Sequence, residues 1–157
     1  MFLYLDTETT GLCVHKGARI VEIAILDEDG DILMDTLVNP LCQIPWQASN
    51  VHGITDSMVR DAPTLDELLP EIGELISNNE LVIYNSSYDT QFFDDGLAEA
   101  EEIHCAMRSF ATHVGSERWI KLVDAASHVG HRWSGKAHRA LADTQACKSV
   151  WDWILEN

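Results

Sequence analysis

The pattern of hydrophobic and polar residues predicts three strands in the first part of the chain. The apolar run Phe2–Leu5 ends at Asp6 and indicates a buried strand. Two further apolar runs, Arg19–Leu26 and Ile32–Val38, flank the acidic segment Asp27–Asp31, whose glycine and aspartates are typical of a hairpin turn. The chain is therefore expected to start with an antiparallel meander.

Helical spacing of apolar residues dominates the rest of the chain, with one more strand-like run inside it. The segment Pro40–His52 shows neither the helical nor the strand spacing of apolar residues and contains Pro45, so we expect an irregular connection there. Strands first and helices later, with one strand–helix unit between them, predict an α/β fold. The expected elements are a helix from Thr64 to about Ser77, a strand at Leu81–Tyr84, a helix after Ser86 and Ser87, a mainly helical stretch over 104–130 and a helix from about Arg139 to Leu155.

Length and composition indicate one domain over residues 1–157. Hydrophobic residues make up 46% of the chain and charged residues 23%, which is ordinary for a soluble globular protein and excludes collagen, coiled-coil and disordered classes. The opening apolar run is too short for a signal peptide or a membrane span. The four cysteines are far apart with no paired spacing, so we expect reduced thiols and a cytoplasmic location.

The net charge restricts the partners that this chain can bind. The chain has 10 Lys and Arg and 26 Asp and Glu, which give a formal net charge of −16. Such a chain repels phosphate backbones and acidic membranes as a whole. An anionic substrate would need a local site that reverses the sign, and divalent cations are one means. Solubility or a saline habitat explains the charge equally well.

Acidic residues stand at the ends of apolar elements in three separate segments. Asp6 and Glu8 close the first strand, and because strand side chains alternate, both point to the same face. Asp89 shares a helical face with aromatic residues, and Asp143 begins the apolar stripe of the last helix. A carboxylate on a core-facing stripe is costly unless it is paired or bound to metal. Each acid alone is also explained as a solvated strand end or a helix-start residue.

Taken together, the four carboxylates predict a metal centre. If they converge, like charges prevent full ionisation unless cations neutralise them. Two divalent ions would balance the cluster and suit a phosphoryl displacement. His138 lies five residues before Asp143, about 140° around a helix, so we expect it on the preceding loop. There a neutral imidazole would accept a proton from attacking water, although a surface histidine explains His138 alone equally well.

These residues resemble the motifs of the DEDD exonucleases of the histidine subtype (DEDDh), the DnaQ-like and exonuclease X-like family with the RNase H-like fold. Tyr84 and Tyr88 stand where the family usually has histidine and phenylalanine. The resemblance implies a mixed central β-sheet, an antiparallel meander followed by a parallel strand, flanked by helices. The matching segments are Asp6-Thr7-Glu8-Thr9-Thr10-Gly11, Tyr84-Asn85-Ser86-Ser87-Tyr88-Asp89, His138-Arg139-Ala140-Leu141-Ala142-Asp143 and Val51-His52-Gly53-Ile54-Thr55.

The resemblance also implies an activity, cofactors and residue roles. The activity is metal-dependent 3′→5′ hydrolysis of the terminal phosphodiester of nucleic acid, with release of nucleoside 5′-monophosphates. Two Mg²⁺ or Mn²⁺ ions per site are implied, with His138 as general base. The implied metal ligands are Asp6, Glu8, Asp89 and Asp143. The implied substrate-binding residues are Thr7, Thr9, Thr10, Gly11, Leu12, His52 and Asn85.

The acidic composition bears on the substrate. Short single-stranded 3′ ends are favoured, because long duplex would need more basic contacts. DNA is expected before RNA, a membrane partner is not expected, and a polymerase partner or a homodimer is compatible with the sequence. Three alternatives stay open: a 3′→5′ exoribonuclease, a proofreading subunit of a DNA polymerase, and a catalytically idle partner-binding module of the same fold.

Two tryptophans accompany basic residues late in the chain. Trp119 and Trp133 flank a stretch that includes Lys121 and Arg132, with Arg118 just before it. Basic and aromatic residues in mixture are typical of surfaces that bind single-stranded nucleic acid by stacking. Packing inside the fold explains the tryptophans equally well.

Overall fold

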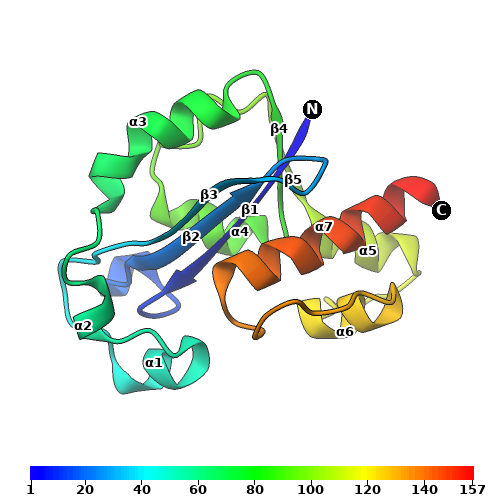
Figure 1. The fold of residues 1–157 in the computed structure, drawn as a ribbon. Coiled ribbons are helices and arrows are strands. Elements are labelled where there is room, and N and C mark those ends of the chain that lie inside the picture. Colours follow the sequence, from blue (N-terminus) through cyan, green and yellow to red (C-terminus); the bar gives the residue numbers. More distant parts are fainter.

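The structure, a computed structural model, describes residues 1–157 and is built on a five-stranded mixed sheet with strand order β3-β2-β1-β4-β5 (Figure 1). Strands β1 (Phe2–Thr9), β2 (Ile20–Leu26) and β3 (Ile32–Leu37) form an antiparallel meander. Strands β4 (Glu80–Ile83) and β5 (Glu102–Cys105) extend the sheet in parallel with β1. The predicted order, meander first and parallel strands after it, is confirmed.

Helices cover both faces of this sheet, so alternate residues of the strands enter two different cores. Leu3 and Leu5 of β1 belong to the core that α3 covers, whereas Tyr4 belongs to the core under α5 and α7. Figure 1 shows α3 on one side of the sheet and α5, α6 and α7 on the other. The helices are α1 (Trp46–His52), α2 (Asp56–Val59), α3 (Leu65–Ile76), α4 (Ser86–Asp89), α5 (Ala106–His113), α6 (Leu122–His128) and α7 (Ala140–Glu156), with single 3₁₀ turns at η1 (Val14–Lys16) and η2 (Thr90–Phe92).

The strands of the meander and the two longest helices lie where the hydrophobic pattern predicts them. The start of α3 shows why, because a capping box marks it in the sequence. The hydroxyl of Thr64 accepts a hydrogen bond from the Glu67 N–H, and the Glu67 carboxylate accepts one from the Thr64 N–H at 2.8 Å. Both bonds use side chains three residues apart, so this boundary depends on local sequence alone.

Two expectations about secondary structure are wrong. The connection expected to be irregular contains α1, whose only buried residue is His52, so no apolar period reveals it. The helix expected after Ser87 is the single turn α4 followed by η2, and the chain then leaves helical geometry at Asp94, where φ is 47°. The stretch 104–130 is mainly helical as expected and contains α5 and α6, but it begins inside β5, an edge strand that the sequence did not predict and that forms by pairing with β4.

The parallel strands determine where the functional motifs meet. Because β1 and β4 run in the same direction, the segments that follow them leave from the same edge of the sheet. Helix α7 packs across β1 and β2 and begins at that edge. None of the helices combines the length and the apolar character that crossing a membrane requires.

Candidate active site

Carboxylates from three segments of the chain converge at this edge of the sheet. Asp6 and Glu8 lie at the end of β1, and Asp143 lies in the first turn of α7. One carboxylate oxygen of each lies within 4.8 Å of the others. Asp89, at the end of α4, is only 3% exposed, and its charge acts on both Asp6 and Glu8. The structure therefore brings the four acids together, with Asp89 outside the tight group of three.

A hydrogen bond from the strand holds Asp89 in place. The hydroxyl of Thr7, between Asp6 and Glu8 on β1, donates to Asp89 Oδ1 at 2.7 Å, and both residues are buried. The Thr7 hydroxyl is thus engaged by a carboxylate of the cluster, and the expected contact of Thr7 with substrate stays a prediction. The bond joins the first and second acidic motifs directly.

An ion pair positions the helix that carries Asp143. Glu22 of β2 lies opposite Glu8 in the sheet register and is buried. Its carboxylate accepts hydrogen bonds from the Arg139 guanidinium and, at 2.7 Å, from the Ala140 N–H at the start of α7. A carboxylate at a helix N-terminus satisfies a free N–H and is favoured by the helix dipole. Glu22 therefore ties α7 to the sheet, and Arg139 neutralises it.

Burial and mutual repulsion raise the pKa values of the acids at the end of β1. For Asp6, burial and then the charges of Asp89 and Glu8 raise the pKa well above its ordinary value. For Glu8, burial and then the charge of Asp143 raise the pKa to about 8, although Arg139 opposes this. The two side chains hold protons at pH values where carboxylates are normally ionised.

The remaining two acids are shifted less because hydrogen bonds favour their charged forms. Burial raises the pKa of Asp89 to about 7, and the bond from Thr7 opposes the shift. Burial raises the pKa of Asp143 to about 6, opposed by the backbone N–H of His138. Four oxygen donors that burial and repulsion keep partly protonated fit hard divalent cations, which would replace those protons. Glu22 does not share this need, because Arg139 balances its charge.

His138 lies outside α7, on the loop where the sequence predicts it. Its backbone N–H donates to Asp143 Oδ1 at 3.1 Å, and its φ of 64° is left-handed, which few residues other than glycine adopt. The side chain is exposed, and its charge acts on Asp143. The backbone of His138 thus orients an acid of the cluster while its ring stays free to meet solvent or ligand.

A cavity of about 330 Å³ opens beside the acids, between the turn after β1 and α1. Of the expected substrate-binding residues, all except Asn85 line it. Tyr88 and three residues of α1 complete the wall, and the sequence reasoning did not select any of them. The lining residues are Thr7, Glu8, Thr9, Thr10, Gly11, Leu12, Gln47, Ala48, Val51, His52 and Tyr88.

The threonine hydroxyls of this turn shape the backbone. The Thr9 hydroxyl donates to the Gly11 carbonyl at 2.7 Å, and the Tyr88 hydroxyl donates to the same carbonyl at 2.9 Å. The Thr10 hydroxyl accepts from the Arg19 N–H at 3.0 Å. In contrast, Leu12 is 84% exposed. The Thr9 and Tyr88 hydroxyls are therefore engaged by the Gly11 carbonyl, and Leu12 offers an apolar side chain to a ligand.

Both nitrogens of the buried His52 are bound to backbone. The Ile54 N–H donates to Nδ1 at 3.0 Å, so Nε2 carries the proton and donates to the Thr9 carbonyl at 3.1 Å. Burial lowers the pKa of His52, which favours this neutral form. The ring lines the cavity and also anchors the end of α1 against the turn after β1.

Glu22 is the other residue of the site that the sequence reasoning did not select. An acid in the middle of the otherwise apolar run Arg19–Leu26 was the available signal. Its partner Arg139 lies inside the third motif, but only the packing of α7 across β2 shows that the two side chains meet.

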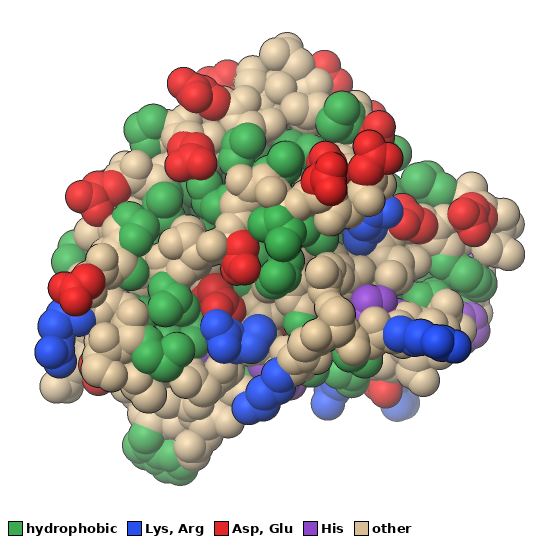
Figure 2. All heavy atoms as spheres, in the orientation of Figure 1, with side chains coloured by type: hydrophobic (Ala, Val, Ile, Leu, Met, Phe, Trp, Pro, Cys, Tyr) green, Lys and Arg blue, Asp and Glu red, His purple; other side chains and the backbone are tan.

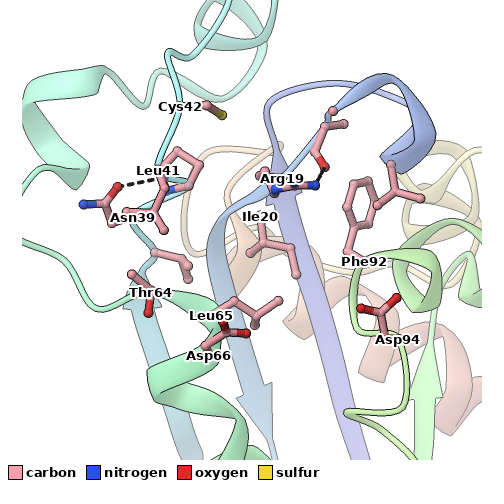
Figure 3. Close-up of a pocket in the computed structure, with 15 residues that line it drawn as sticks. Arg19, Ile20, Asn39, Leu41, Cys42, Thr64, Leu65, Asp66, Phe92 and Asp94 are labelled. Atoms are coloured by element: carbon pink, nitrogen blue, oxygen red, sulfur yellow. Dashed lines mark hydrogen bonds between the residues drawn. The ribbon is translucent and has the colours of Figure 1, made fainter.

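A separate cavity of about 450 Å³ lies between the β1–β2 connection, the segment after β3 and the start of α3. Figure 3 shows Arg19, Asn39, Leu65 and Asp94 around it. None of the four clustered acids lines this space, so it is not part of the acidic site.

Comparison with known proteins identifies relatives of the whole fold. Residues 3–150 match the RNase_T family, described as exonuclease. The uncharacterized exonuclease CP81 of Escherichia phage 186 is 40% identical over an alignment of 168 residues that covers 96% of this chain and 86% of the phage protein. A solved structure of exonuclease X in complex with 5′-overhanging duplex DNA superposes with a TM-score of 0.79 at 28% identity, covering 99% of this chain and 92% of that one.

A polymerase subunit is also similar, over part of its length. The DNA polymerase III subunit epsilon of Rickettsia conorii is 33% identical over 100 residues, or 61% of this chain. The match covers 44% of the subunit, so this chain spans less than half of that relative. These similarities confirm the family resemblance drawn from the motifs and the expected RNase H-like fold.

Without bound cations, the cluster should destabilise the protein as pH rises. Folded-state pKa values above the ordinary ones mean that the folded protein holds extra protons, so stability falls between about pH 4 and pH 8. Asp89→Asn removes one of these groups and keeps the acceptor for Thr7. The Tm of Asp89→Asn minus the Tm of the original protein, both measured in EDTA, should therefore be larger at pH 8 than at pH 5. A Tm difference that is constant or decreasing would contradict this account.

Loss of Glu22 should loosen α7. Glu22→Ala removes the charge-assisted bonds to Arg139 and Ala140, which predicts a loss of about 1.5–3 kcal/mol in the free energy of unfolding. Urea denaturation followed by circular dichroism measures it. Glu74→Ala, which removes an exposed acid of α3, is the matched control for charge and should change stability by less than about 0.5 kcal/mol. Equal effects of the two substitutions would show that the ion pair does not stabilise α7.

Proposed function

The chain belongs to the RNase_T exonuclease family, and we propose that residues 1–157 act as a single metal-dependent 3′→5′ exonuclease domain. It hydrolyses the terminal phosphodiester of nucleic acid, with single-stranded DNA ends favoured, and releases nucleoside 5′-monophosphates. The convergence of Asp6, Glu8, Asp89 and Asp143 beside an exposed histidine is the observation that carries this proposal.

The cluster suits a pair of Mg²⁺ or Mn²⁺ ions. Asp6, Glu8 and Asp143 would hold one ion, and Asp6 and Asp89 the other. Ions bound there would neutralise the carboxylates and stabilise the charge that develops on the attacking and leaving oxygens of the phosphodiester. The buried, mutually repelling oxygen donors favour such binding, because no Lys or Arg forms an ion pair with any of these four acids.

The cavity beside the cluster would seat the 3′-terminal nucleotide. The exposed Leu12 and the α1 residues Ala48 and Val51 offer apolar surface for a sugar or base. The turn Thr9–Gly11 is held by the hydroxyl of Tyr88, which keeps its main chain in one conformation. Asn85 lies outside the cavity lining, at the start of α4, and its contact with substrate stays a prediction.

His138 would act as the general base. Water attacks the terminal phosphorus, the imidazole of His138 accepts the proton of that water, and the bond from phosphorus to the 3′ oxygen of the penultimate nucleotide breaks. The ring is exposed and close to Asp143, so it reaches the space beside the acids without being a required ligand. Its neutral form is the one that accepts a proton.

Partners and location follow from the same reasoning. The solved relative exonuclease X holds duplex DNA with a 5′ overhang, which favours DNA over RNA as the substrate here. The similarity to a polymerase III epsilon subunit favours a second candidate, a proofreading role with a polymerase partner. The four cysteines are unpaired, which supports a cytoplasmic location. A homodimer stays a prediction.

Asp6→Ala should abolish the activity. With 5′-labelled single-stranded DNA and Mg²⁺ or Mn²⁺, the original protein should shorten the strand from its 3′ end and release nucleoside 5′-monophosphates. Asp6→Ala should lower the rate by more than about 100-fold, because even residues outside the ligand shell cost 10–100-fold. Glu74→Ala, which removes an exposed acid of α3 outside the cluster, is the control and should retain activity.

The outcome also separates the alternatives. Shortening that persists in EDTA or in Asp6→Ala would refute a metal-dependent site. Absence of any shortening would favour the idle module. Faster cleavage of a matched RNA strand would favour the exoribonuclease, and co-purification with a polymerase subunit would favour proofreading.

Replacement of His138 should reduce turnover and leave metal binding intact. Loss of a general base costs about 10²–10⁴-fold in rate. His138→Asn tolerates the left-handed backbone and keeps the N–H bond to Asp143, so it isolates the role of the ring. With single-stranded DNA and saturating Mn²⁺ at one pH, the rate of His138→Asn should therefore be about 10²–10⁴-fold below that of the original protein. If calorimetry showed weaker Mn²⁺ binding by His138→Asn, the ring would be a ligand instead of a base.

A further inference from the structure

The positive charge of this acidic protein is concentrated in one part of the chain. Residues 61–107 contain 12 Asp and Glu and no Lys or Arg, whereas residues 108–139 contain six Lys and Arg and only two acids. Arg139 is engaged by Glu22, and the other five basic side chains are exposed. Those five are Arg108, Arg118, Lys121, Arg132 and Lys136.

The surface shows the same separation of charge. Figure 2 shows acidic side chains over the upper part of the molecule, where Figure 1 places α3 and the β2–β3 hairpin. Most Lys and Arg on this face lie lower, where α6 and the loop into α7 lie. A net charge of −16 therefore coexists with a local surface that attracts anions.

An exposed tryptophan lies within this basic region. Trp119, on the loop between α5 and α6, is 64% exposed, whereas Trp151 is buried and Trp153 packs against the same core. The guanidinium carbon of Arg108 lies 5.8 Å from the centroid of the Trp119 ring, in cation–π range. Arg118 and Lys121 flank the tryptophan in sequence. A large aromatic surface is thus exposed to water, with one positive charge against its ring and two more basic residues within two positions of it in the sequence.

Arg108 connects this region to the candidate active site. Its guanidinium donates to the Ser87 hydroxyl at 3.0 Å, and Ser87 lies in α4, two residues before Asp89. Helix α5, which carries Arg108, follows β5 just as α4 follows β4, and the two strands are parallel. Arg108 and Trp119 therefore lie on the edge of the sheet where the acids converge.

We propose that Arg108, Arg118, Trp119 and Lys121, here called the Trp119 patch, bind the single strand that leads away from the 3′ end in the active site. A base stacks on the Trp119 ring, and the basic side chains contact the phosphates. The patch rests on the proposed exonuclease function and specifies its substrate as an unpaired strand of several nucleotides. Stacking suits this occupant better than duplex, because paired bases do not present a face to an aromatic ring.

Two substrates of different length test the patch. The p-nitrophenyl ester of thymidine 5′-monophosphate occupies only the terminal nucleotide site, whereas a 12-nucleotide single strand extends beyond it. Trp119→Ala should reduce kcat/KM for the strand by about 5- to 150-fold more than for the ester, the loss expected for one stacked base. Trp119→Phe should restore most of the loss, because phenylalanine also stacks.

Salt dependence tests the charges. Arg108→Ala should decrease the slope of log Kd against log salt concentration by about one for the 12-nucleotide strand, measured by fluorescence anisotropy in EDTA. Arg60→Ala, which removes an exposed arginine in the segment after α2, is the matched control and should leave the slope unchanged. Equal effects of the two substitutions would overturn the patch in favour of a general charge effect.

The remaining outcomes distinguish the patch from the proposed function. If the original protein hydrolyses the ester but Trp119→Ala affects ester and strand equally, the patch is wrong and the exonuclease function stands. If the original protein hydrolyses neither substrate, the proposed function fails. Binding of the 12-nucleotide strand, measured by fluorescence anisotropy, then shows whether the Trp119 patch contacts a single strand. If Trp119→Ala binds the strand as tightly as the original protein does, the patch is overturned in either case.

Discussion

The repulsion among four partly buried carboxylates is the constraint on which the rest of this structure depends. Asp6, Glu8, Asp89 and Asp143 come from segments that only the sheet topology and the placement of α7 bring together. Holding them there costs stability, because burial and like charges both oppose ionisation. The surrounding bonds offset that cost: Thr7 stabilises Asp89, and the backbone of His138 stabilises Asp143.

Glu22 shows how the fold separates a structural acid from the acids of the site. It lies opposite Glu8 on the neighbouring strand and is equally buried, yet Arg139 and the start of α7 satisfy its carboxylate. No basic side chain does the same for the other four. The protein thus uses its own cation to fasten α7 and leaves the acids beside it without an ion-pair partner, which is the arrangement that the proposed metal-dependent function requires.

The distribution of charge over the whole surface also restricts where nucleic acid can bind. A strongly acidic surface disfavours extended contact with nucleic acid, so recognition is restricted to places where the sign is reversed. In the proposed function, divalent ions would reverse the sign at the acidic cluster, and the proposed Trp119 patch would reverse it with side chains of the chain itself. Because both lie on one edge of the sheet, a short unpaired strand can meet both, whereas the acidic remainder of the surface discourages longer contacts.

Local sequence patterns determined much of the secondary structure of this protein and showed its acidic motifs. The strands of the meander, the capped start of α3 and the long α7 are predictable because their periods and caps involve residues close in sequence. The acidic motifs were visible for the same reason. Only the tertiary structure decided that β5 pairs with β4, that the Thr7 hydroxyl meets Asp89, and that Glu22 meets Arg139. Each of these depends on the register of strands or on contacts between distant segments, and short-range sequence patterns carry no information about either.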